Sequence, residues 1–197
     1  MMQELALGGF LNYDASFLSK EEADKLLEFL RANVSWEQKF YTDWKTGRKF
    51  PQPRLTAWYA DDPNMAYSYS GITQIVQSWT PELLQVKEKA EAISGAQYNS
   101  VLLNFYRDGR DSVGLHADDE RELGDNPNIA SVSLGTTRLF RLRSNNDASN
   151  IVEYQLSHGS LLVMSGTTQR HWKHEVPKDH NIHTSRINLT FRKFYAP

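Results

Sequence analysis

From Ser100 to the C-terminus the chain consists of short apolar runs separated by turn residues, and this pattern constrains the fold more than any other feature. Gly, Ser, Asn, Asp and Thr stand between the runs, as at Gly135-Thr136-Thr137. Short runs bounded in this way are typical of antiparallel strands in a sandwich or barrel. We therefore predict strands over residues 100–106, 129–134, 138–143, 151–156, 160–164 and 187–194.

Two helices are expected before these strands. Ser19 and Glu22 have the spacing of a capping box, and the helix they begin should end near Asn33. Thr80-Pro81 is a second helix start, and Gly95 should end that helix. With no repeat or linker in the sequence, we expect one domain over residues 1–197, a mainly β sandwich or jelly roll packed on helices. Periodicity alone does not distinguish it from other β-barrels.

Composition excludes several kinds of chemistry. The chain has no cysteine, which excludes disulfides, thiolate catalysis and cysteine-ligated metal sites. A net charge of −2 gives no global basic field for nucleic acid. There is no signal-peptide pattern at the start and no apolar run of the roughly 20 residues that a membrane span needs. We expect a monomeric cytoplasmic protein, or a nuclear one in a eukaryote.

His116 and Asp118, together with the distant His174, are candidate metal ligands. Residues two apart on an extended segment project to the same side. Two histidines and one carboxylate are the ligand set of a non-haem Fe(II) site with open positions. By itself a His-x-Asp pair is more often a chance arrangement in a loop, and the same three residues could also hold zinc. Of the other histidines, we interpret His158 as a solvated turn residue, His171 as a group near the site, and His180 and His183 as exposed.

The segment from Arg186 to Arg192 alternates polar and apolar residues. If it is a strand, Arg186, Asn188, Thr190 and Arg192 share one face, and the residues between them face apolar packing. Two arginines on one buried face favour a bound anion, because guanidinium groups bind carboxylates bidentately. The alternative is the polar outer face of an edge strand. Asn104 and Tyr106 form a similar pair, which could bind a carboxylate or cap a sheet edge.

Together these ordered motifs resemble the AlkB family of Fe(II)/2-oxoglutarate dioxygenases, particularly its DNA-repair branch. The resemblance covers at least residues 53–194 and is specific because many motifs match in order. The matching segments are Leu103-Asn104-Phe105-Tyr106-Arg107-Asp108-Gly109, His116 to Leu123, Ile129 to Gly135, His158 to Met164, His174-Glu175-Val176-Pro177 and Arg186 to Arg192.

The resemblance implies a role for each candidate. It implies a double-stranded β-helix core over about residues 100–195 and a nucleotide-recognition lid over about residues 35–75. His116, Asp118 and His174 match the family's iron ligands. Arg192 matches the arginine that, with Tyr106, pairs with the distal carboxylate of 2-oxoglutarate. Arg186 and Asn104 match groups near the other carboxylate, and Asn188 and Thr190 complete the co-substrate set.

On the substrate side, Tyr69 matches an aromatic ring that stacks on an extruded base, with His116 on the base's other face. Tyr67 and Arg54 lie in the lid segments, and Asp119 could contact an exocyclic nitrogen of the base. The alternatives are core aromatics for the tyrosines and a solvated charge run for Asp119. Residues 39–54 interleave basic and aromatic side chains, which fits a nucleic-acid grip or an ordinary hairpin with a solvated face.

The predicted reaction is oxidative dealkylation of bases such as 1-methyladenine and 3-methylcytosine in alkylated DNA, with RNA as a second candidate. It uses Fe(II), 2-oxoglutarate and O2. The co-substrate is decarboxylated to succinate, the N-alkyl carbon is hydroxylated, and the product releases an aldehyde. An RNA demethylase or protein hydroxylase with the same chemistry is the first alternative. A binding module that has lost catalysis is the second.

Overall fold

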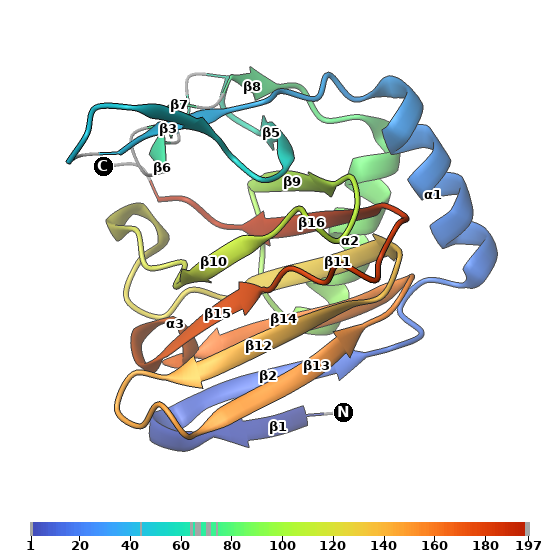
Figure 1. Cartoon of the computed structure of the whole chain (residues 1–197). Coiled ribbons are helices and arrows are strands. Elements are labelled where there is room, and N and C mark those ends of the chain that lie inside the picture. Colours follow the sequence, from blue (N-terminus) through green and yellow to red (C-terminus); the bar gives the residue numbers. More distant parts are fainter. Residues whose placement is uncertain are drawn as a thin grey trace.

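Two sheets face each other in the computed structural model, which describes residues 2–43, 45–63, 65, 68–69, 72–73 and 75–195 (Figure 1). The large sheet has the order β1-β2-β14-β11-β16-β9-β5-β8, and the small sheet has the order β10-β15-β12-β13. The small sheet covers one face of the large sheet, and helices α1 and α2 cover the other (Figure 1). This is the predicted mainly β jelly roll packed on helices.

The strands of the large sheet are β1 (Met2–Leu5), β2 (Gly9–Asp14), β5 (Leu55–Ala60), β8 (Val76–Gln77), β9 (Ser100–Tyr106), β11 (Ile129–Gly135), β14 (Ser160–Gly166) and β16 (Arg186–Arg192). Those of the small sheet are β10 (Val113–His116), β12 (Arg138–Ser144), β13 (Ile151–Leu156) and β15 (Trp172–Val176). Two hairpins lie outside these sheets, β3 (Phe40–Thr42) with β4 (Lys49–Pro51) and β6 (Ser68–Tyr69) with β7 (Ile72–Thr73). Short helices are η1 (Ala6–Gly8), η2 (Arg121–Leu123) and α3 (Thr168–His171).

Both predicted long helices form where their capping residues indicate. In α1 (Lys20–Asn33) the Ser19 side chain accepts from the Glu22 backbone, and the Glu22 carboxylate accepts from the Ser19 backbone. In α2 (Pro81–Ser94) Thr80 caps the start, and Gly95 ends the helix with a φ of 67°. Both helices bury leucines against the large sheet. Within the described part of the chain, no helix is long and apolar enough to cross a membrane.

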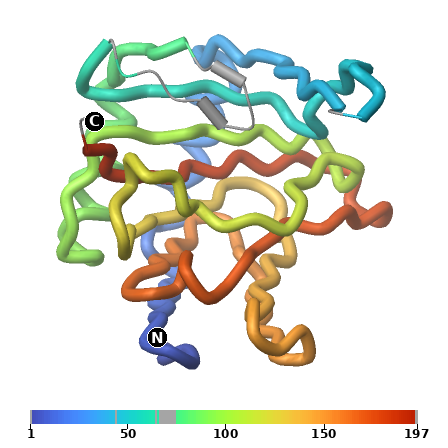
Figure 2. The backbone as a smooth tube through the Cα atoms, turned by 90° about the vertical axis from the view of Figure 1, so that its left-hand side faces the viewer, coloured from blue at the N-terminus to red at the C-terminus, as the bar shows by residue number. Residues whose placement is uncertain are grey.

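The two main sheets contain the six predicted strands and six that the sequence did not predict: β1, β2, β5, β8, β10 and β15. β10 and β15 lack the apolar pattern of a buried strand, because they contain His116 and His174 and one face of each strand is partly exposed. β5 falls within the segment predicted as a lid, yet it pairs with β9 along six residues and is mostly buried. The remainder of that segment includes the β3–β4 hairpin, at the end of the molecule opposite the N-terminus (Figure 2).

The large sheet separates two hydrophobic cores. One core lies under the helices and includes Ile187, Leu189 and Phe191 of β16. The other lies between the sheets and includes Phe140, Trp172 and Met164. The polar residues of β16 face this second core, so the space between the sheets contains polar groups as well as apolar walls.

Candidate metal centre and anion pocket

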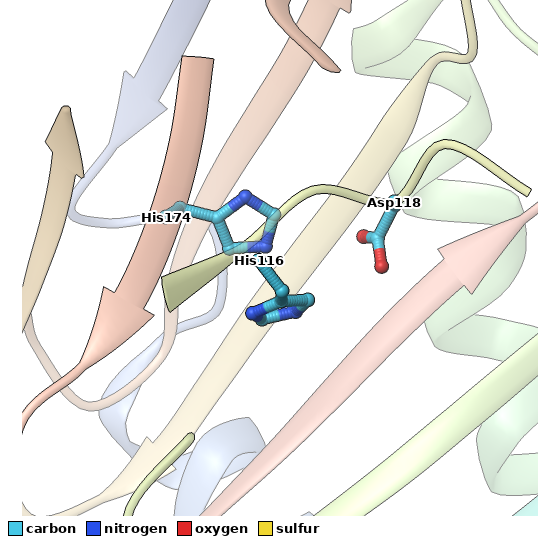
Figure 3. A group of neighbouring side chains, drawn as sticks. All are labelled: His116, Asp118 and His174. Atoms are coloured by element: carbon cyan, nitrogen blue, oxygen red, sulfur yellow. The ribbon is translucent and has the colours of Figure 1, made fainter. Parts of the chain in front are cut away.

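Three candidate ligands meet at the end of the small sheet (Figure 3). His116 lies directly opposite His174 in the ladder between β10 and β15, and their ring centroids are 4.3 Å apart. Asp118 follows two residues after His116. One ligand atom from each residue lies within 4.8 Å of the others, which is close enough for the three to hold a metal ion. Chance placement of the His-x-Asp pair does not account for this convergence with His174.

The surroundings keep Asp118 and His174 in the protonation states that a metal requires. Burial, helped by the charge of nearby His116, lowers the pKa of His174 to about 3, so its ring is neutral at pH 7. Burial also acts to raise the pKa of Asp118, but the positive charge of Arg192 and the interactions with the two imidazoles outweigh it and lower that pKa to about 2. The Nδ1 of His116 lies 2.8 Å from the Gly114 carbonyl oxygen, a contact that orients the ring.

Asp118 has one oxygen engaged and one available. Its Oδ1 accepts from the Arg192 guanidinium at 2.7 Å, and both side chains are buried. Its Oδ2 is buried and has no hydrogen-bond partner among the described residues. Since buried carboxylate oxygens nearly always have partners, this oxygen is placed as a cation ligand would be.

A cavity between the two sheets extends from these ligands along β16. β16 runs in the centre of the large sheet, paired with β11 on one side and β9 on the other, and all seven of its residues are buried. The reading of this segment as an edge strand is therefore wrong. Arg186, Asn188, Thr190 and Arg192 line the cavity, as the predicted alternation requires.

Arg186 is a buried cation that forms no ion pair within the described part of the chain. It is 1% exposed, and its Nη2 donates to the Ser133 hydroxyl at 2.9 Å. Its Nε and Nη1 have no partner among the described residues. Burial and the nearby Arg138 cation lower its pKa to about 10. Since an uncompensated buried charge is strongly unfavourable, this end of the cavity is suited to an anionic group.

Tyr106 lies against Arg186 and not against Arg192, contrary to the expected pairing. The Arg186 guanidinium is 5.1 Å from the centroid of the Tyr106 ring. β9 and β16 are antiparallel, with Tyr106 opposite Arg186 and Ser100 opposite Arg192. Arg192 instead contacts Asp118 at the metal end. The predicted pairing of Tyr106 with Arg192 is therefore wrong, because Arg186 lies beside Tyr106.

The remaining candidates on this face differ in what they can offer a ligand. Asn188 donates to the Ser131 hydroxyl and the Val132 carbonyl, and Thr190 donates to Asn188, so these amide and hydroxyl protons are used within the sheet. The Asn104 carbonyl oxygen accepts from Arg54 Nε at 2.8 Å, which leaves the Asn104 amide nitrogen as its donor toward the cavity.

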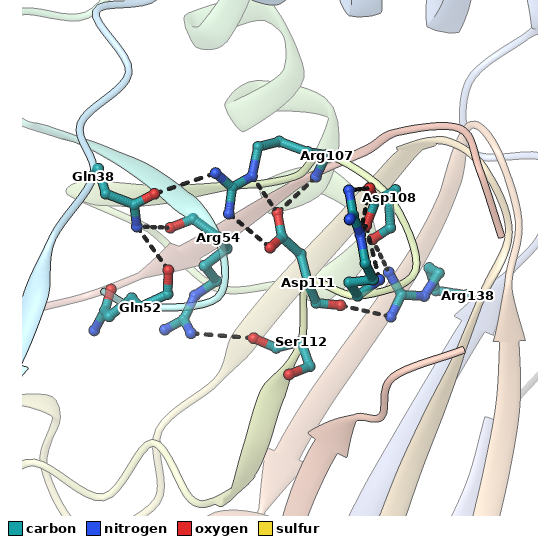
Figure 4. Close-up of polar contacts among 9 residues, drawn as sticks. Gln38, Gln52, Arg54, Arg107, Asp108, Asp111, Ser112 and Arg138 are labelled. Atoms are coloured by element: carbon teal, nitrogen blue, oxygen red, sulfur yellow. Dashed lines mark hydrogen bonds and ion pairs between the residues drawn. The ribbon is translucent and has the colours of Figure 1, made fainter. Parts of the chain in front are cut away.

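Arg54 belongs to a polar network that joins the β3–β4 hairpin to the cavity (Figure 4). Besides Asn104, it contacts the Ser112 carbonyl oxygen at 3.4 Å. Gln38 donates to the carbonyls of Gln52 and Arg54 at the base of the hairpin, and accepts from Arg107. Arg107 in turn forms a bidentate pair with Asp111. The sequence did not predict this network, because Arg107-Asp108-Gly109-Arg110 has only the pattern of a turn.

The residues proposed to bind the substrate differ in where they lie and in whether the structure describes them. Tyr67 lies outside the described residues, and Tyr69 is in β6 but its side chain is not described. Asp119 is exposed beside Asp118. Trp58 and Tyr59 are core aromatics, 0% and 3% exposed. Arg54 and His116 line both the inner cavity and an outer depression, which continues over Leu115 and Tyr41.

One further expectation is wrong. His158 is half-buried rather than a solvated turn residue: its Nδ1 accepts from the Gly135 backbone, and its Nε2 contacts Asp24 of α1. It joins a helix to two strand ends, which a local pattern does not reveal. His180 and His183 are exposed, as predicted.

Comparisons with known proteins agree with this geometry. The family model of the 2OG-Fe(II) oxygenase superfamily matches residues 11–192. The rat alpha-ketoglutarate-dependent dioxygenase alkB homolog 3 (Rattus norvegicus) is 43% identical over 91% of this chain and 62% of its own length. The bovine DNA oxidative demethylase ALKBH2 (Bos taurus) is 37% identical over 93% of this chain and 69% of its own.

A solved structure of OsALKBH1 shares the fold, with a TM-score of 0.64 at 18% identity, covering 98% of this chain and 100% of that one. The chain spans less than two thirds of the length of the alkB homolog 3 relatives from rat and human, 62% and 64% respectively.

Proposed function

The chain belongs to the 2OG-Fe(II) oxygenase superfamily and, within it, to the AlkB homologues, and from this premise we propose that it oxidatively demethylates N-alkylated bases in DNA. The observation that carries the proposal is that one cavity holds both a three-residue metal site and the buried guanidinium of Arg186, whose Nε and Nη1 have no partner among the described residues. A zinc hydrolase would have no use for that second feature.

We assign His116, Asp118 and His174 as the residues that hold Fe(II). The donor set fits, because two imidazoles and one carboxylate leave positions open for a co-substrate and oxygen. The available Asp118 Oδ2 supports the assignment. When bound, the iron supplies the activation of O2 that is coupled to decarboxylation of 2-oxoglutarate to succinate.

For 2-oxoglutarate, we assign the distal carboxylate to Arg186 and Tyr106, and the keto-acid end to the side of Asn104 and the metal ligands. Arg186 offers two donors, Nε and Nη1, that have no partner among the described residues, and charged donors of this kind suit a carboxylate. Asn188 and Thr190 act on the co-substrate through the shape of the cavity, since their protons are already donated.

The protein's own residues prepare this site in three ways. Arg192 holds Asp118 ionised and fixed in direction. Burial keeps His174 neutral. Leu102, Phe140, Met164 and Val176 form apolar walls of the cavity, which exclude water and strengthen the electrostatic contacts inside it.

The alkylated base would enter from the outer depression that borders His116 and Arg54. Beside it, the β3–β4 hairpin exposes Phe40, Tyr41 and Phe50, with the Tyr41 and Phe50 rings stacked 5.7 Å apart. Lys45, Arg48 and Lys49 are also exposed on this hairpin and suit a phosphate backbone. Asp119 and the Tyr69 ring would favour a cationic alkylated base. We propose alkylated DNA as the partner, with the chain acting as a monomer in the cytoplasm, or in the nucleus of a eukaryote.

Mass spectrometry of a panel of alkylated oligonucleotides tests the proposal. Single- and double-stranded DNA and RNA carrying 1-methyladenine or 3-methylcytosine are incubated with Fe(II) and 2-oxoglutarate, and succinate is measured in parallel. We expect base repair and succinate in matched amounts, and neither in the His116→Ala protein. Repair confined to RNA would reassign the substrate, and repair by His116→Ala would overturn the iron assignment.

A further inference from the structure

Gln169 connects the two segments that carry Asp118 and His174. It lies in α3, which leads directly into β15 and His174, and it is 2% exposed. Its Oε1 accepts from the Asp118 backbone N–H at 3.0 Å. Residues 117–120, which contain Asp118, belong to neither a strand nor a helix. A single buried side chain therefore joins an irregular loop to the element next to the third ligand.

The orientation of the Gln169 amide is fixed by a second contact. Its Nε2 donates to the sulfur of Met164 at 3.4 Å. A thioether only accepts hydrogen bonds, so the nitrogen must face Met164 and the oxygen must face the Asp118 N–H. The amide cannot flip without losing both contacts.

The α3 helix itself rests on the N-terminal turn. Thr168 Oγ1 accepts from the Phe10 backbone at 3.1 Å, and the Thr167 backbone donates to the Gly8 carbonyl at 3.1 Å. A Cβ on Gly9 would lie 2.9 Å from Thr168 Oγ1, so the two segments are in close contact. Gln169 thus extends from a rigid base.

We propose that Gln169 is a positioning residue for the metal centre. By holding the Asp118 backbone, it keeps the carboxylate between Arg192 and the imidazoles. The inference rests on the proposed function for the identity of the metal, but its content is a contact between this residue and a ligand loop. Outer partners of metal ligands typically contribute about 10- to 100-fold to metal affinity.

Co(II) binding to the full chain, measured anaerobically by calorimetry and by the Co(II) absorption spectrum, tests this. Gln169→Leu keeps the side chain buried but removes the acceptor. Gln169→Asn keeps the amide on a side chain that is one methylene too short to reach the Asp118 backbone, and it replaces the leucine variant in the test if that protein does not fold. We expect the Co(II) Kd to rise about 10- to 100-fold in either, with an altered Co(II) spectrum.

Leu26→Ala is the matched control, because Leu26 is buried in the helical layer, in the other hydrophobic core. It should lower the melting temperature without changing Co(II) affinity, which separates positioning from general loss of stability. A Kd within twofold of wild type in both Gln169 variants overturns the inference, and so does an equal loss in Leu26→Ala. A wild-type chain that binds no Co(II) overturns the metal centre itself, and this inference with it.

Discussion

Replacement of Arg186 by methionine distinguishes binding of the distal carboxylate of 2-oxoglutarate from binding of its keto-acid end. The side chains are similar in length, but methionine cannot bind a carboxylate. Hydrogen bonds to charged groups contribute roughly 1.5–3 kcal/mol each. Arg186 has two unpartnered donors, Nε and Nη1. Losing two such hydrogen bonds should therefore weaken 2-oxoglutarate binding by about 3–6 kcal/mol, which is roughly two to four orders of magnitude in Kd.

The assay is anaerobic calorimetric titration of the Mn(II)-loaded protein with two keto acids. 2-Oxoglutarate has the distal carboxylate, and 2-oxopentanoate has a methyl group in its place. We expect Arg186→Met to lose affinity for 2-oxoglutarate and to bind 2-oxopentanoate about as wild type does. An equal loss for both ligands would refute the assignment of Arg186 to the distal carboxylate and would favour the arrangement predicted from the sequence, with Arg192 in that role.

The same substitution should also affect the stability of the ligand-free protein. Burial lowers the Arg186 pKa from 12.5 to about 10, so the charged form is disfavoured in the fold. Each pKa unit corresponds to about 1.4 kcal/mol, which makes the unliganded charge unfavourable by roughly 3 kcal/mol. The apo Arg186→Met protein should thus melt no lower than wild type. A clear drop in its melting temperature would mean that Arg186 serves the fold rather than a ligand.

Three further predictions concern other parts of the molecule. Asp118→Asn should destabilise the apo protein by about 3–5 kcal/mol in urea unfolding, because it removes the charge that pairs with the buried Arg192 guanidinium; the exposed Asp119→Asn should change stability by less than about 0.5 kcal/mol. Charge reversal of both Arg48 and Lys49 should weaken oligonucleotide binding and lower the salt-dependence slope by about 2 while succinate formation without DNA is unchanged; a double reversal of Lys20 and Lys25 on α1 that did the same would argue against the hairpin. Burial, followed by the Glu91 charge, raises the pKa of Tyr98 to about 12. The neutral Tyr98 side chain therefore contributes fully to the free energy of unfolding below pH 10, and this contribution is lost between pH 10 and about 12. Tyr98→Phe should remove this part of the fall in unfolding free energy at alkaline pH.

The sequence by itself determined the features that depend on local periodicity and on residue chemistry. The capping box at Ser19 and the Thr80-Pro81 pair located the two long helices, because a helix end is decided by the few residues around it. Alternation along Arg186–Arg192 correctly separated the cavity face from the core face. The family, the fold and the pairing of Fe(II) with 2-oxoglutarate also followed from ordered motifs, and the comparisons confirm them.

Tertiary structure alone decided which residues meet across strands. The antiparallel register of β9 and β16 places Tyr106 with Arg186, and the central position of β16 makes its arginines buried rather than solvated. Gln169 reaches Asp118 across 51 positions of sequence, and Gln38 reaches Arg107 across 69. No local pattern encodes such contacts, because they arise when separate elements pack against each other. The chemical groups of this site can be predicted from the sequence, but the packing of the two sheets determines which of them lie next to each other along the cavity.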